Sequence, residues 1–140
     1  MSQTKTYSLD ILTPQRQFFS GEVEALTIRP PDGSLTVLAG HAPLIAPFGP
    51  GCLGIKTEGE WREAFHSEGF MEVSRTQVVI FAQLCEWADE IDSGEALEEK
   101  QRAEELLRQK QSFNEHRLAE IALARAMARL KISQQRINLK

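Results

Sequence analysis

The stretch that decides the fold runs from Ile91 to Arg108 and reads IDSGEALEEKQRAEELLR. Before it, apolar residues come in short runs separated by turn residues, which is typical of β-strands. Within it, Leu and Ala begin to recur at helical spacing, and neither Gly nor Pro occurs after Gly94. We therefore expect a β unit over residues 1–90 and a helical unit over residues 91–140.

Charge also changes along the helical part. Residues 86–114 hold nine acidic and four basic side chains, whereas residues 115–140 hold two acidic and six basic ones. The formal charge of the whole chain is -4 at pH 7, which argues against a general affinity for nucleic acid. The basic stretch also lacks interleaved aromatic residues, so an RNA or DNA site is not expected there.

The length of 140 residues leaves room for one ordinary domain, or for a small domain with an appendage. The N-terminal residues are polar, and no apolar run approaches the roughly 20 residues needed to cross a bilayer. We therefore expect a cytoplasmic chain whose contact with a membrane would depend on a partner. Cys52 and Cys85 form no metal-ligand cluster and are expected to be buried thiols.

In the first part, Tyr7, Leu9 and Ile11 alternate with polar residues, which predicts a strand with one buried face. Pro30-Pro31-Asp32-Gly33 predicts a tight exposed loop, and Glu58-Gly59 predicts a hairpin turn. Further strands are expected over residues 23–28, 34–38, 52–56, 61–65, 70–73 and 77–82. Many short strands at close spacing favour a β-sandwich or flattened barrel.

Two helices are expected in the second part, over residues 93–111 and 115–132. The break at Ser112-Phe113-Asn114 supplies a cap for the second helix, either Ser112 or Asn114. A short connection between two amphipathic helices favours an antiparallel hairpin. Helices of this length are marginal alone, so their apolar stripes must be buried. The residues are compatible with a hairpin that moves as a switch and with one that stays docked.

Three segments together resemble one known family. Residues 19–24 read FSGEVE, residues 40–44 read GHAPL, and residues 124–130 read ARAMARL. In this order and at these separations they resemble the epsilon subunit of F-type ATP synthase. The resemblance implies a ten-stranded β-sandwich followed by a two-helix hairpin. It also implies a non-catalytic rotor subunit that couples ion translocation to ATP synthesis and inhibits ATP hydrolysis through its C-terminal helices.

The resemblance implies partners for two loops of the β unit. The loop of Pro31, Asp32, Gly33 and Ser34 lies where relatives touch the membrane c-ring, and the whole complex would hold the chain peripherally at the cytoplasmic face of the cell membrane. His41, Ala42 and Pro43 lie where relatives face the gamma subunit. From the residues alone, the first segment is an ordinary hairpin turn and His41 is a loop or core histidine, with a ring that could hydrogen-bond a backbone group.

The resemblance also implies a role for the basic end of the second helix. Arg125, Arg129 and Lys131 would meet acidic side chains of the catalytic alpha and beta subunits when the hairpin extends along gamma. Exposed ion pairs contribute only about 0–1 kcal/mol each, so several would be required. The other interpretation is a solvated helix face whose cations lie favourably near the helix C-terminus.

Some members of the family bind ATP on the folded hairpin. The positions that the resemblance assigns to this ATP site are Glu86, Ile91, Asp92, Arg102, Arg125 and Arg129. However, Glu95 stands where the ATP-binding signature has Arg, which removes a phosphate-pairing donor and adds a like charge. Asp92 and Glu95 also fit a helix-capping box. We therefore expect weak or absent ATP binding and no required cofactor.

The sequence leaves two alternatives to the rotor subunit. One is a free-standing nucleotide-sensing module with a mobile helical lid, which would not need a gamma-like partner. The other is a small hydrolase using Cys52 or Cys85 with His41 or His66, for which no activating pair has a recognisable spacing. The coupling ion, proton or sodium, would bind to other subunits, and residues 133–140 fit either a frayed helix end or an inserted contact.

Overall fold

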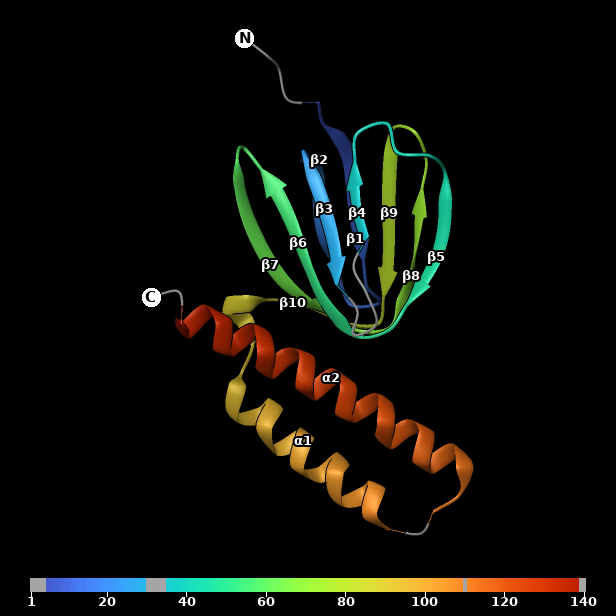
Figure 1. Cartoon of the computed structure of the whole chain (residues 1–140), viewed down its shortest axis with the longest axis vertical. Helices are drawn as coiled ribbons and strands as arrows, with labels where there is room; N and C mark the ends of the chain where they lie inside the picture. The colour runs from blue at the N-terminus through green and yellow to red at the C-terminus, as the bar shows by residue number, and fades with distance from the viewer. Residues whose placement is uncertain (1–4, 30–34, 110, 139–140) are drawn as a thin grey trace.

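The structure is a computed structural model, and it describes the backbone of residues 5–29, 35–109 and 111–138. The described part of the chain forms two packed β-sheets, followed by a short 3-10 turn and two helices (Figure 1). The predicted architecture, a ten-stranded β-sandwich with a two-helix hairpin, is therefore confirmed.

The strands, in chain order, are β1 (Tyr7–Leu12), β2 (Gln17–Val23), β3 (Ala25–Arg29), β4 (Leu35–Leu38), β5 (Leu44–Phe48), β6 (Gly51–Thr57), β7 (Glu60–His66), β8 (Gly69–Val73), β9 (Gln77–Ala82) and β10 (Cys85–Trp87). They are followed by the 3-10 turn η1 (Ala88–Glu90) and by the helices α1 (Ser93–Arg108) and α2 (Phe113–Asn138).

One sheet has the strand order β2-β1-β9-β8-β5, and the other has the order β10-β7-β6-β3-β4. Strand β1 pairs parallel with β9, and the other neighbouring strands pair antiparallel. The core lies between the sheets, where Leu9, Leu26, Leu53 and Ile80 are fully buried. The Tyr7 hydroxyl donates to the Val37 carbonyl at 2.6 Å, which satisfies the one polar atom that this side chain brings into the core.

Three strands were missed by the alternation of apolar residues. Strand β2 carries Ser20 and Gly21 at its centre, so its apolar pattern is interrupted. Strand β5 contains Pro47, which is tolerated because β5 is the edge of its sheet and needs no amide donor on its open side. Strand β10 has only three residues, too few to show a period.

The predicted turn at Glu58-Gly59 and the caps at Asp92 and Ser112 are confirmed, whereas the predicted loop at residues 30–33 lies outside the described residues. Glu58 and Gly59 join β6 to β7 with φ values of 50° and 80°, as a two-residue hairpin of the I′ type requires. Asp92 caps α1 by accepting the Glu95 amide at 3.0 Å, and Ser112 caps α2 by accepting the Glu115 amide at 3.2 Å. The helix ends differ from the prediction, because α1 ends at Arg108 and α2 begins two residues earlier than expected.

Helix α2 also extends beyond the predicted end at residue 132. Ile132 is almost completely buried, so the chain at this point is held against the β unit and does not fray. In Figure 1 the two helices run antiparallel, and α2 lies between α1 and the end of the sandwich where β6, β7 and β10 meet. The hairpin is thus folded against the β unit.

Candidate functional site

The candidate site is the contact between α2 and the outer side of β6, β7 and η1 (Figure 1). Its apolar part is a cluster of Cys52 from β6, Phe65 from β7, Ile91 from the connection to α1, and Ile132 from α2. Cys52 and Phe65 are cross-strand neighbours, so they present one continuous surface to the helix. We call this contact the hairpin interface.

Arg129 lies one helical turn before Ile132 and is only 4% exposed. Its guanidinium makes a bidentate pair with Glu86 of β10, with Nε–Oε1 at 2.7 Å and Nη2–Oε2 at 3.2 Å. The remaining nitrogen, Nη1, donates to Glu99 of α1 at 3.0 Å and lies 3.8 Å from a carboxylate oxygen of Glu95. A single side chain therefore connects the sandwich to both helices.

The electrostatics of Arg129 combine opposing effects. Burial disfavours its charge, but the hydrogen bond and attraction from Glu86, with further attraction from Glu99 and Glu95, outweigh burial and raise its pKa above the ordinary value. The guanidinium therefore stays charged and depends on its carboxylate partners. Removing one partner of a buried ion pair lowers the stability strongly, because the other charge is left buried and uncompensated. This loss is larger than the stability that the intact pair adds relative to two apolar residues.

Arg125 lies one turn earlier on α2 and pairs with Glu68, which is located in the connection between β7 and β8. The Nε atom of Arg125 is 3.0 Å from Oε2 of Glu68. About a third of each side chain is exposed, so this pair resembles a surface ion pair and contributes about 0–1 kcal/mol. Arg129 is therefore the stronger of the two polar anchors.

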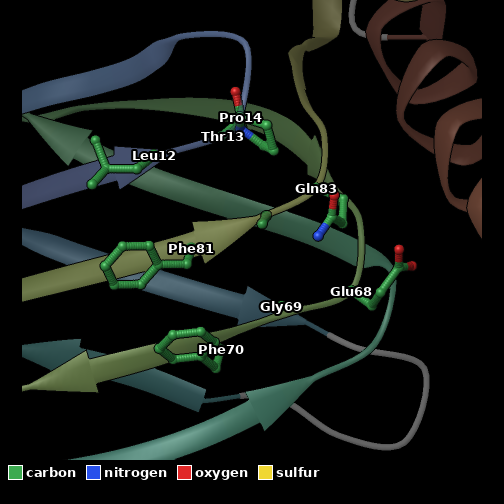
Figure 2. A pocket seen from close by; sticks show the side chains of 9 residues that line it. Leu12, Thr13, Pro14, Glu68, Gly69, Phe70, Phe81 and Gln83 are labelled. Carbon is green, nitrogen blue, oxygen red and sulfur yellow. The ribbon is translucent and has the colours of Figure 1, made fainter.

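A second surface lies on the outer face of the sheet that contains β8 and β9, and Figure 2 shows its hollow. Phe70 stacks on Phe81 with ring centroids 4.9 Å apart, and Leu12 and Pro14 line the same hollow of about 420 Å³. Ile45, on the neighbouring edge strand β5, is 74% exposed. We call these five residues the apolar sheet face.

The apolar sheet face is not predicted by the sequence pattern. Phe70 and Phe81 sit at outward positions of β8 and β9, where alternation predicts polar residues. The sequence signal for this face is therefore the pair of aromatic residues at strand positions that point away from the core. Contiguous exposed apolar patches are one mark of a contact surface or a binding groove.

The cysteines do not have the properties of nucleophiles. Burial raises the pKa of Cys52 to about 11 and that of Cys85 to about 12, so both remain thiols at neutral pH. His66 is fully buried, and burial lowers its pKa, so its imidazole is neutral. Its Nδ1 donates to the Ser67 carbonyl at 3.0 Å, so the ring has a structural role.

Within the described residues, no group of three or more His, Cys, Asp or Glu side chains is arranged to hold a metal ion. Likewise, none of the helical segments that the structure describes combines the length and the apolar character needed to cross a membrane.

Two family models match consecutive parts of the chain. Residues 6–88 match the beta-sandwich domain of the ATP synthase delta/epsilon chain, and residues 89–134 match its long alpha-helix domain. The chain belongs to the ATP synthase delta/epsilon family. Each of the two matched domains coincides with one structural unit, since the strands end at Trp87 and α1 begins at Ser93.

Curated members of this family resemble the chain over nearly their full length. The ATP synthase epsilon chain of Caldanaerobacter subterraneus subsp. tengcongensis is 47% identical over 132 residues, which are 94% of this chain and 96% of the relative. The ATP synthase epsilon chain of Ruminiclostridium cellulolyticum is 44% identical over 131 residues, covering 94% and 98%.

Solved structures share the fold. A chain in the cryo-EM structure of the Euglena gracilis mitochondrial ATP synthase has a TM-score of 0.76 and 24% identity, over 96% of this chain and 82% of that one. A chain in the central stalk and c-ring structure of the Tetrahymena thermophila enzyme has a TM-score of 0.68 and 12% identity, over 94% and 99%.

The structure brings together some of the residues that the sequence resemblance assigns to an ATP site. Glu86 and Arg129 are bonded, Ile91 is buried beside them in the hairpin interface, and Asp92 caps α1. Arg102, in contrast, is exposed on α1. Glu86 and Arg129 are therefore already paired with each other, whereas Arg102 lies apart from them.

Arg125 and Arg129 face the sandwich when the hairpin is folded. A solvated basic helix face is therefore wrong for Arg129, which is almost completely buried, whereas Lys131 is exposed as that interpretation predicted. The partner carboxylates of Glu68 and Glu99 were also missed, because they are distant in sequence and carry no local signal.

The two predicted partner loops differ in how far the structure describes them. His41 lies between β4 and β5, and its Nδ1 is 2.8 Å from the Ala42 carbonyl, so the expected backbone hydrogen bond is present. Ala42 and Pro43 are exposed beside it. The segment Pro31, Asp32, Gly33 and Ser34 lies outside the described residues.

We expect the apolar part of the hairpin interface to carry much of its stability. Ile132→Ala should lower the free energy of opening the hairpin by about 2–4 kcal/mol, because a buried Ile leaves a cavity when truncated. Met127→Ala, on the exposed side of the same helix, should change it by less than about 0.5 kcal/mol. Native-state hydrogen exchange of α2 amides measures both values, and equal effects would contradict the docked arrangement.

Proposed function

We propose that the chain works as the epsilon subunit of the central stalk of an F-type ATP synthase. In this role it is a non-catalytic part of the rotor, couples ion translocation to ATP synthesis and inhibits ATP hydrolysis through its C-terminal helices. The observation that carries the proposal is the match of both domains of the delta/epsilon family, in order, over residues 6–134. The buried, protonated thiols of Cys52 and Cys85 argue against the alternative of a cysteine hydrolase.

The sandwich supplies the docking function. We assign the apolar sheet face and the neighbouring segment His41, Ala42 and Pro43 to contact with the gamma subunit. Pro43 and Ile45 line a second hollow next to β8, so the predicted loop and the apolar surface are continuous. The segment of residues 31–34 is assigned to the c-ring from the family resemblance. Through these partners the chain is held peripherally at the cytoplasmic face of the membrane.

The helices supply the regulatory function. Apolar side chains remain exposed on the folded hairpin, and they are Leu97, Leu106, Phe113, Leu118 and Met127. Their exposed fractions of 41–77% leave apolar area that a second, extended arrangement along gamma would bury. In that arrangement Arg125, Arg129 and Lys131 become available to acidic side chains of the catalytic alpha and beta subunits.

ATP is not needed to hold the folded hairpin in this proposal. A polyphosphate approaching Arg129 would have to replace Glu86 and Glu99, and it would meet the Glu95 carboxylate near the same nitrogen. Like charges in such proximity repel, and the guanidinium is already engaged on all three of its nitrogens. The folded state therefore carries its own anionic partners, and no cofactor is required.

If the sandwich docks the chain and the helices inhibit, the result of a titration can be predicted. An epsilon-depleted catalytic complex is titrated with the full chain and with a version that ends at Glu90, and ATP hydrolysis is measured. Both versions should bind tightly, because docking is located in the sandwich. Only the full chain should inhibit, because inhibition requires the helices.

A matched control for that titration is Phe70→Ser, which alters the apolar sheet face without touching the hairpin interface. This variant should bind the complex more weakly and still fold, because Phe70 is 42% exposed. Equal inhibition by both lengths would remove the helices from the mechanism. If neither the full chain nor the shortened version binds, the free-standing nucleotide-sensing module becomes the better explanation.

Calorimetric titration with ATP tests the role of the nucleotide. We expect no saturable binding at micromolar concentrations, because Arg129 is occupied by carboxylates. Glu95→Arg is the matched variant, since it restores the signature residue and removes one competing charge, and it should raise the affinity. Micromolar binding by the unchanged chain, lost on changing Arg125 and Arg129, would contradict the proposal.

A further inference from the structure

One guanidinium joins three segments of the chain that are far apart in sequence. Arg129 belongs to α2, Glu86 to β10 of the sandwich, and Glu99 with Glu95 to the first two turns of α1. Its side chain is 5% exposed, so these partners replace water almost completely. The contact between α1 and α2 and the contact between α2 and the sandwich therefore share one charged group.

We infer that Arg129 couples two steps of hairpin opening, the release of α2 from the sandwich and the separation of α1 from α2. The inference rests on the proposed mobility of the hairpin. Buried alone with Glu86, the guanidinium would lose the attraction of Glu99 and Glu95 that helps to offset its burial. Docking of α2 on the sandwich is therefore stronger while α1 is in place.

The coupling is reciprocal, as any coupling between two binding equilibria must be. When Glu86 is removed from Arg129, the charge that α1 pairs with is no longer held in a fixed position. Glu99 then loses a partner whose geometry the sandwich had set. The sandwich thus stabilises the closed hairpin, and the closed hairpin stabilises docking. Glu99 takes part in this coupling from α1, through its bond to Arg129 of α2.

Arg125 provides an internal comparison. Its partner is Glu68 of the sandwich, and α1 contributes no carboxylate to that pair. Both side chains of the pair are about a third exposed, so water can replace either partner at small cost. Arg125 therefore contributes to docking without coupling docking to α1, and this difference separates a coupling residue from an ordinary anchor.

The chain contains its own reporter of docking. Cys52 belongs to the hairpin interface together with Ile91 and Ile132, whereas Cys85 belongs to the core between the two sheets. When α2 leaves the sandwich, the Cys52 thiol becomes accessible to a small thiol reagent. Cys85 stays protected as long as the sandwich is folded, so it reports unfolding within the same molecule.

The test measures the labelling rate of both cysteines in the full chain, by mass spectrometry after N-ethylmaleimide treatment. Glu99→Gln should raise the Cys52 rate by at least about threefold, and Arg129→Gln by at least about tenfold, because more partners are lost. Glu98→Gln, with the same charge change at an exposed neighbouring position of α1, should leave the rate unchanged. Cys85 should stay slow in every variant.

A Glu99→Gln rate equal to that of Glu98→Gln would overturn the coupling, even if Arg129→Gln were fast. If Arg129→Gln also exposes Cys85, the variant has unfolded, and Glu99→Gln alone decides. Ile132→Ala separates this inference from the proposed mobility. A faster Cys52 rate in Ile132→Ala with no effect of Glu99→Gln leaves the hairpin mobile but removes the coupling, whereas no effect in any variant overturns both.

Discussion

A buried guanidinium needs partners for its charge, and at Arg129 this requirement determines how the two helices pack against each other and against the sandwich. It fixes the face of α2 that meets the sandwich, because Ile132 lies one turn further along the same side. It also places acidic residues of α1 towards α2, where Glu99 reaches Nη1 at 3.0 Å. The composition of the helices, acidic in the first and basic in the second, thereby has a structural use.

The position of Glu86 depends on a rigid junction between the two units. The Trp87 ring stacks on Phe18 with centroids 4.4 Å apart, and the Arg62 guanidinium carbon lies over the Trp87 ring, 3.7 Å from its centroid. Arg16 pairs with Glu90 at 2.9 Å just after this point. The chain is thus held at both ends of η1, so a hairpin that opens would hinge near Ile91, which is buried in a cluster with Ile132 of α2.

The sequence predicted the architecture well, because the alternation of Tyr7, Leu9 and Ile11 and the helical spacing after Gly94 are local patterns. It missed β2 and β5, where Gly21 and Pro47 interrupt the pattern at positions that the sheet tolerates. Six positions of a suggested ATP site were identified from a family resemblance, and part of that set meets in space. The carboxylate partners could not be predicted, because such pairs connect residues 30–57 positions apart and depend on tertiary packing.

The most direct test is nuclear magnetic resonance of the arginine side chains in the full chain, labelled with nitrogen-15. The account predicts an Nε–H signal of Arg129 that exchanges slowly with water and has separate Nη resonances, because Glu86 and Glu99 fix the guanidinium plane. Arg129→Lys assigns this signal by its loss, and Glu86→Gln should broaden it. Rapid exchange of every arginine side chain in the folded protein would contradict the account.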